Sequence, residues 1–120
     1  MTFRRKEIGK SAEDLALKEI KKQGLKVLER NFKTKFGEID ILAEDKEAVV
    51  IVEVKAKTQE QYGDPKEAVD WKKKRKLWQL GKFLEMKYPG RSIRIDVVAI
   101  KFLEDKLPII EYIKNAVTSP

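Results

Sequence analysis

The chain has 120 residues and a mass of 14.0 kDa, and its 27 Lys and Arg against 20 Asp and Glu give a formal net charge of +7. It contains no His and no Cys, which excludes Ser-His-Asp and Cys-His nucleophile systems, thiol redox chemistry and zinc sites built on these ligands. Catalysis is limited to carboxylates, lysines, hydroxyls and a hard metal ion, and the positive charge points to a partner that carries phosphate groups.

The length of the chain fits a single domain over residues 1–120. No apolar run approaches the roughly 20 residues of a membrane span, and the charged start lacks the apolar stretch of a signal peptide. We therefore expect a protein with no membrane partner, located in the cytoplasm.

The first half of the chain predicts one helix and three strands. Ser11 and Asp14 form a candidate capping box for a helix over residues 11–23, which Gly24 would end. Alternating or continuous apolar residues predict strands over 25–32, 37–44 and 48–58. The β-branched run in residues 48–58 is typical of a central strand that is covered on both faces.

The second half predicts a long helix and one or two further strands. Gly63-Asp64-Pro65 opens the helix, which reaches about Tyr88 and is ended by Pro89-Gly90. A strand follows over residues 92–102, and Pro108–Ile113 is a candidate edge strand. The order αβββαβ predicts an α/β domain, with a mixed central sheet flanked by helices.

Charged residues interrupt the apolar pattern of the predicted central strand. Alternation puts Glu53, Lys55 and Lys57 on one face. Burying an unpaired ion would cost several kcal/mol, on the order given for buried charges. Glu53 and Lys55 therefore either pair with each other, lie where the strand emerges into solvent, or form part of a site.

The neighbouring strand adds a second carboxylate to this face. In an antiparallel hairpin with a two- or four-residue loop, Asp40 lies opposite Glu53 or Ile51, which places it on the face of Glu53 and Lys55. Two adjacent carboxylates repel unless a cation lies between them, and both Lys55 and a divalent ion such as Mg²⁺ suit that role. The set suits metal-assisted phosphodiester hydrolysis, in which Lys55 stabilises developing charge or positions the nucleophile.

Glu13 is a third candidate carboxylate. At about 100° per residue it lies inside the apolar arc of the first predicted helix, which is unusual for Glu. The alternative is a carboxylate of the first turn that complements the helix dipole.

Basic residues gather in two segments, at the amino-terminal arm and in the second predicted helix. Lys73 interrupts an apolar stripe there, either as a lysine with a buried stem or as a cation directed at a phosphate. The other candidates for nucleic-acid contacts are basic positions suited to backbone phosphates: Arg4, Arg5, Lys57, Lys72, Lys74 and Arg75.

An ordered set of residues resembles a known signature. Gly37-Glu38-Ile39-Asp40, followed thirteen residues after Asp40 by Glu53-Val54-Lys55, resembles the PD-(D/E)XK nuclease motif. Across nearly the whole chain the pattern resembles the YraN-like family of small bacterial proteins, relatives of archaeal Holliday junction resolvases. The wider likeness rests on Gly9, Glu13, Ala16, Asn31, Gly63, Pro65, Ala68-Val69, Lys73 and Arg94-Ile95-Asp96-Val97-Val98.

The resemblance implies a restriction-endonuclease-like fold and an endonuclease that depends on Mg²⁺ or Mn²⁺. It implies that Asp40 and Glu53 are metal ligands, that Lys55 is the catalytic lysine, and that Glu13 is the helix carboxylate that some superfamily members add to the site. The expected substrate is branched, flapped or single-stranded DNA. Junction resolution needs two coordinated cuts, so a homodimer is expected for that activity.

Two other functions remain open from the sequence. The first is a nucleic-acid-binding protein that keeps the nuclease-like fold without the activity. The second is a protein-interaction domain that uses Trp71 and Trp78, which are seven residues apart and therefore share one helix face.

Overall fold

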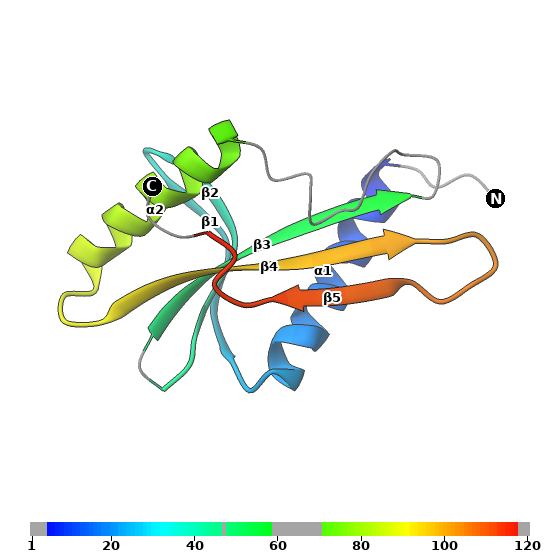
Figure 1. Ribbon diagram of the computed structural model, residues 1–120, viewed down its shortest axis with the longest axis horizontal. Helices are drawn as coiled ribbons and strands as arrows, with labels where there is room; N and C mark the ends of the chain where they lie inside the picture. The colour runs from blue at the N-terminus through cyan, green and yellow to red at the C-terminus, as the bar shows by residue number, and fades with distance from the viewer. Residues whose placement is uncertain (1–4, 47, 59–70, 118–120) are drawn as a thin grey trace.

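A computed structural model, which describes residues 5–46, 48–58 and 71–117, contains a five-stranded sheet with two helices (Figure 1). The strand order is β1-β2-β3-β4-β5; β3 and β4 are parallel, and the other neighbours are antiparallel. This confirms the predicted mixed α/β class and is compatible with a restriction-endonuclease-like core. The elements are α1 (Arg5–Lys22), β1 (Lys26–Thr34), β2 (Gly37–Glu44), β3 (Ala48–Thr58), α2 (Trp71–Lys87), β4 (Ser92–Phe102) and β5 (Ile109–Ile113).

The predicted bounds hold best for the strands. β2, β3 and β4 match the predicted ranges to the residue, while β1 is shifted by one or two residues at its ends. The predicted start of the first helix is wrong, because α1 begins at Arg5 and Ser11 lies inside it rather than at its cap. Arg, Lys and Glu are good helix formers, so the helix continues through them toward its amino terminus. The predicted opening of the second helix, at 63–70, lies outside the described residues.

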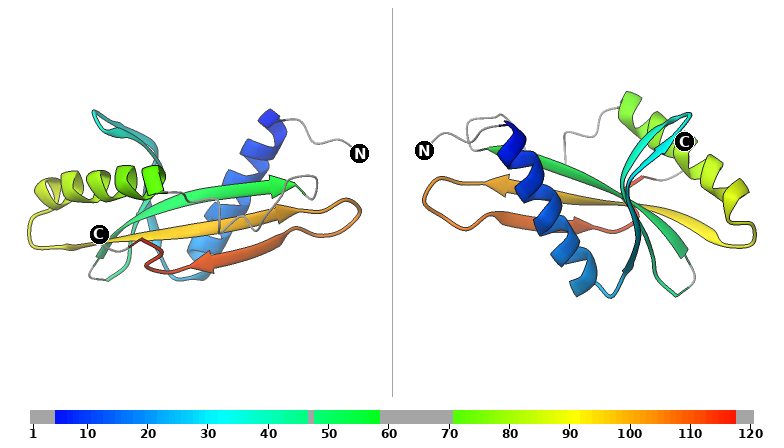
Figure 2. Two further views of the ribbon diagram at one scale, coloured as in Figure 1. Left: turned by 45° about the horizontal axis from the view of Figure 1, so that its top comes forward. Right: turned by 180° about the vertical axis from the view of Figure 1, so that it is seen from behind.

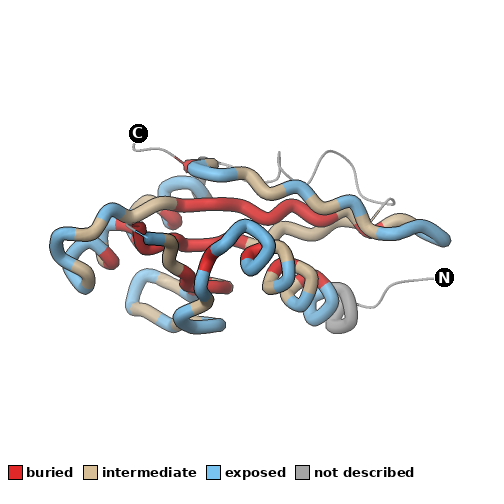
Figure 3. The backbone as a smooth tube through the Cα atoms, turned by 90° about the horizontal axis from the view of Figure 1, so that it is seen from below, coloured by how far each residue is buried: buried red, intermediate tan, exposed pale blue. Residues whose placement is uncertain are grey.

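Each helix covers one face of the sheet, because neighbouring residues of a strand point to opposite sides. The buried residues Ala16 and Ile20 of α1 pack with Val50 of β3. Leu80 of α2 packs with Val49 and other buried residues on the opposite face. β3 and much of β4 are therefore enclosed, and Figure 3 shows this buried centre flanked by exposed turns. None of the helices that the structure describes is long and apolar enough to span a membrane.

The β1–β2 hairpin leaves the plane of the sheet toward α2. Ile41 faces the α1 side, yet Ile39, two residues earlier, is buried in the cluster on the α2 side. Its partner across the hairpin, Phe32, packs against the same cluster. β2 thus rotates between Ile39 and Ile41, and the turn of the hairpin lies alongside α2 in both views of Figure 2.

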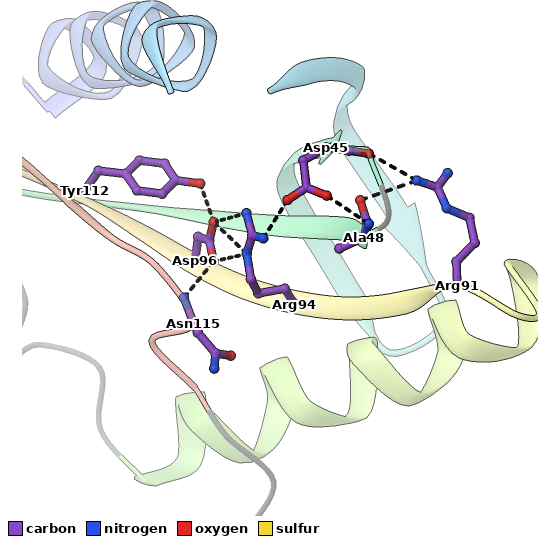
Figure 4. Close-up of polar contacts among 7 residues, drawn as sticks. All are labelled: Asp45, Ala48, Arg91, Arg94, Asp96, Tyr112 and Asn115. Atoms are coloured by element: carbon purple, nitrogen blue, oxygen red, sulfur yellow. Dashed lines mark hydrogen bonds and ion pairs between the residues drawn. The ribbon is translucent and has the colours of Figure 1, made fainter. Parts of the chain in front are cut away.

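A buried carboxylate, Asp96, organises the carboxyl-terminal part of the sheet (Figure 4). It is 0% exposed and accepts hydrogen bonds from Nε and Nη2 of Arg94, from the Tyr112 hydroxyl and from the backbone N–H of Asn115. A buried charge is tolerated only when it is paired and hydrogen-bonded, and four donor groups satisfy this condition here.

Arg94 extends the network from β4 to the β2–β3 turn. Its Nη1 donates to Oδ2 of Asp45 at 2.6 Å, and Oδ1 of Asp45 accepts the backbone N–H of Ala48 at 2.9 Å. Partial burial by itself would lower the pKa of Arg94, but its bonds to Asp96 and Asp45 raise it above the ordinary value. Burial, with the bond to Asp96, raises the pKa of Tyr112 above 10. The network joins β4, β5 and the turn between β2 and β3.

Replacing Tyr112 by Phe removes one donor from Asp96, and we expect a loss of about 1–3 kcal/mol in the free energy of unfolding. Because the pKa of Tyr112 is higher in the folded state, its stabilising contribution is complete below the unfolded value and falls as the pH rises above about 10. Urea unfolding should therefore give a constant difference between wild type and variant from about pH 7 to 9, and a smaller one above about pH 10.

Tyr88→Phe is the matched control, because Tyr88 packs against the apolar cluster on the α2 side of the sheet. It should leave the stability within about 0.5 kcal/mol of wild type. Equal stability of Tyr112→Phe and Tyr88→Phe would contradict a stabilising role for the bond to Asp96.

Candidate functional site

The exposure of β3 changes along its length, and Glu53 lies at the boundary. The strand is buried from Ala48 to Glu53 and half-buried from Val54 to Thr58. Glu53 is 5% exposed, and its Oε1 lies 3.4 Å from the Nζ of Lys55. Of the alternatives that the sequence leaves open, pairing between these two side chains is confirmed. An ion pair this deeply buried gives little net stability compared with apolar residues of similar size.

Asp40 contacts the same segment of β3 through its side chain. The ladder between β2 and β3 has its last paired residues at Ile41 and Val52. One residue beyond Ile41 on β2 and two beyond Val52 on β3, Oδ2 of Asp40 accepts the backbone N–H of Val54 at 3.0 Å. The carboxylate thus continues the link between the two strands where their backbones separate, and it is anchored within the sequence Glu53-Val54-Lys55.

Asp40 does not follow the simple alternation of side chains along β2. The prediction that it shares a face with Glu53 and Lys55 is therefore wrong. Glu53 and Lys55 alternate with Val54 and Ala56, which pack on the α1 side of β3. Asp40 lines a pocket of about 280 Å³ together with Val54 and Ala56. The physical reason is the rotation of β2 described above, which places Asp40 at the edge of β3 rather than over the face of Glu53.

Glu13 of α1 lines the same pocket as Asp40, next to the small residues Gly9 and Ala12. Its side chain is 25% exposed, and Oε1 accepts hydrogen bonds from Nη2 and Nε of Arg30 at 2.9 and 3.1 Å. The amide of Asn31 also donates to it, at 3.4 Å. Glu13 therefore faces the sheet as its place in the apolar arc predicts, and it is held there by β1.

Arg30 is the contact that the sequence pattern did not reveal. It is exposed, lies 17 residues from Glu13 and has no periodic relation to it. The neighbouring Asn31 has a positive φ of 51°, which Asn tolerates better than most residues. That conformation is the one local signal near this contact, and it indicates a special backbone position rather than a partner.

The residues present fit a hard divalent cation in their donor chemistry. Asp40 and Glu53 offer carboxylate oxygens from neighbouring strands, and such ions are often held by one or two carboxylates with water. Over residues 5–46, 48–58 and 71–117, no three acidic side chains form a compact group suited to a metal. Asp40 and Glu53 are therefore the two carboxylates next to the Val54 backbone whose oxygens suit such an ion, and they lie on different faces of β3.

The predicted basic contacts are described only in part. Lys57 is half-buried on β3, two residues beyond Lys55, and Lys74 and Arg75 are exposed on α2. The other predicted contacts and Trp71 have side chains outside the described residues; they are Arg4, Arg5, Lys72 and Lys73. Trp78 is partly exposed on α2, where the Nζ of Lys82 lies 5.2 Å from the centre of its ring.

Comparison with known proteins identifies relatives along most of the chain. A protein from Thermodesulfovibrio yellowstonii named UPF0102 protein is 42% identical over 114 residues, covering 92% of this chain and 95% of its own. UPF0102 proteins from Persephonella marina and Thermotoga petrophila are 44% and 46% identical over 77% and 76% of this chain, and 81% and 83% of their own. The model of the family described as "Uncharacterised protein family UPF0102" matches residues 12–100. The chain therefore belongs to the UPF0102 family, which is the YraN-like family that its sequence resembles.

Proposed function

We propose that this protein is a metal-dependent endonuclease that hydrolyses phosphodiester bonds in structured or single-stranded DNA. The observation that carries the proposal is the bond from the Val54 N–H to Asp40, which joins this carboxylate to the segment of the buried Glu53–Lys55 pair. Charged groups in a largely apolar strand are unfavourable for folding, and functional sites are where such arrangements are commonly found.

Asp40 and Glu53 would hold a Mg²⁺ or Mn²⁺ ion. When bound, such an ion supplies Lewis acidity to the scissile phosphate. Lys55 pairs with Glu53 on the same face of β3, and its ammonium group would stabilise negative charge on the phosphate or orient the attacking water. Lys57 and the exposed Lys74 and Arg75 would contact neighbouring phosphates.

The net charge of +7 supports a polyanionic partner, and the site itself is acidic. A protein that only bound DNA would gain nothing from placing two carboxylates near the phosphates, since they repel them. The two carboxylates therefore favour hydrolysis over the alternative, a catalytically inactive nucleic-acid-binding protein with the same fold. Experiment distinguishes the two.

Asp40→Asn and Glu53→Gln should each lower DNA cleavage about 100-fold or more, because each removes a charged ligand. Lys55→Met should lower it by a similar factor, through the loss of charge stabilisation. The assay uses labelled branched, flapped and single-stranded DNA with Mg²⁺ or Mn²⁺, and EDTA should abolish the activity.

Glu85→Gln is the control for this series, since Glu85 is an exposed carboxylate on α2. Thermal unfolding of each variant separates loss of activity from loss of fold, which matters most for Glu53→Gln because it removes the carboxylate that pairs with Lys55. Cleavage by Asp40→Asn and Glu53→Gln at the wild-type rate would refute the assignment. Metal-independent DNA binding without cleavage by the wild type would favour the inactive alternative.

Glu13 needs a test of its own, because Arg30 holds it beside Asp40. If Glu13 assists the metal site, Glu13→Gln should raise the Mn²⁺ concentration for half-maximal cleavage several-fold. Arg30→Met breaks the same ion pair but keeps the carboxylate, so it should leave that concentration unchanged or lower it.

Asp14→Asn is the matched control, since Asp14 is the exposed neighbour of Glu13 on α1. A solely structural role predicts equal effects of Glu13→Gln and Arg30→Met, confined to a stability change of about 1 kcal/mol or less. That outcome would remove Glu13 from the proposed site.

A further inference from the structure

The turn of the β1–β2 hairpin and one side of α2 form a continuous surface. The ring of Phe36, at the turn, contacts the ring of Phe83 edge to face, with centroids 5.9 Å apart. The stem of Lys76 lies against Gly37, so close that a Cβ built there would come within 2.5 Å of the lysine Cε. At the other end of the contact, the Nζ of Lys87 lies 4.2 Å from the centre of the Phe32 ring. We call these six residues and Lys35 the hairpin–α2 surface.

This surface is strongly basic. The sequence of α2 has seven Lys and Arg and one acidic residue, Glu85. The hairpin turn adds Lys33 and Lys35, and the nearest acidic residue along it is Glu38. The ammonium groups of Lys35 and Lys87 belong to exposed residues, so they are accessible to a partner. A concentration of positive charge of this kind attracts phosphate groups.

Aromatic rings are interleaved with these cations. Phe36 is 40% exposed, and the Nζ of Lys35 lies 5.2 Å from the centre of its ring. Exposed cation–π pairs and single exposed apolar residues are both ordinary on protein surfaces. Their combination with a basic helix is the pattern of proteins that bind single-stranded nucleic acid, in which bases stack on aromatic rings beside cations that contact the backbone.

The surface is also continuous with the candidate site along one strand. Gly37 begins β2 and Asp40 lies three residues further, which corresponds to about 10 Å of strand. At about 3.4 Å of helix axis per nucleotide in a duplex strand, and more in an extended single strand, this spans at most about three nucleotides. A strand held at the hairpin turn would therefore have its scissile bond within reach of Asp40.

We propose that the hairpin–α2 surface binds a single-stranded segment of DNA, with a base stacked on Phe36 and phosphates at Lys35, Lys76 and Lys87. Unpaired bases are favoured because the faces of bases inside a duplex are already stacked and cannot contact Phe36. The choice of DNA rests on the proposed function. The surface would select substrates with an unpaired strand next to the cleaved bond, such as flaps or frayed branches.

Binding of a fluorescent oligothymidylate in EDTA tests this proposal by anisotropy, without any need for cleavage. Phe36→Ala should weaken binding of the single strand about 5- to 100-fold and change binding of a duplex of equal length by less than about twofold. Phe36→Trp keeps a ring, so it should retain the affinity and give an emission signal that is quenched by the oligonucleotide. Lys35→Gln should weaken binding of both the single strand and the duplex, and it should lower the salt dependence of binding.

Leu107→Ala and Lys106→Gln are the matched controls, because both residues are exposed in the segment between β4 and β5, and Leu107 is 88% exposed. Neither variant should change the affinity for the single strand or for the duplex. Equal losses in Phe36→Ala and Leu107→Ala, or equal losses for single strand and duplex, would overturn the proposal. So would absence of single-strand binding by the wild type, or tighter binding of a matched oligoribonucleotide than of DNA.

The failure of this proposal is distinguishable from the failure of the proposed nuclease activity. If Asp40→Asn binds the oligothymidylate like wild type and Phe36→Ala does not, the surface is supported whether or not the wild type cleaves DNA. If Asp40→Asn abolishes cleavage while Phe36→Ala leaves both binding and cleavage of single strands unchanged, the nuclease assignment stands and the surface is refuted.

Discussion

Parallel pairing between β3 and β4 constrains the rest of the structure, because parallel neighbours cannot be joined by a tight turn. The two strands pair from Ala48 with Ser92 to Thr58 with Phe102, and the connection between them includes α2. That connection places α2 on one face, and the opposite face is covered by α1. β3 is thereby central and enclosed, and this is why the charged residues at its carboxyl-terminal half are conspicuous.

The candidate site lies where this regular pairing ends. β2 separates from β3 beyond the pair of Ile41 and Val52, which would leave a backbone N–H of β3 in need of an acceptor. Asp40 supplies that acceptor with its side chain, at Val54. This local departure from the ladder thus has two effects. It gives the backbone N–H of Val54 an acceptor, and it places the carboxylate of Asp40 next to the segment that holds Glu53 and Lys55. The same departure turns the hairpin toward α2, so the basic aromatic surface and the site share one cause.

The two buried carboxylates among the described residues, Asp96 and Glu53, differ in the way that structural and functional groups commonly differ. Asp96 has donors from three parts of the chain and joins β4, β5 and the segment after β5, so its role in the fold is evident. Glu53 lies at the edge of the enclosed region and pairs with Lys55, two residues further along the same strand. A charged pair at the point where an apolar strand becomes exposed is the better candidate for chemistry, because functional sites commonly hold charges in positions that are unfavourable for folding.

The strands, the fold class and the family could be predicted from the sequence, because these depend on patterns that are local along the chain. The alternation in residues 37–44 and the β-branched run from Val49 to Val54 give correct bounds for β2 and β3, and the ion pair of Glu53 with Lys55 follows from their spacing of two. The start of α1 was wrong because a capping pattern at Ser11 is only one of several local preferences. Three features could not be predicted and became evident in the folded chain: the surroundings of Asp40, the contact of Glu13 with Arg30 and the packing of Phe36 on Phe83. These depend on the rotation of β2 and on side chains 14 to 47 residues apart, and no period in the sequence encodes them.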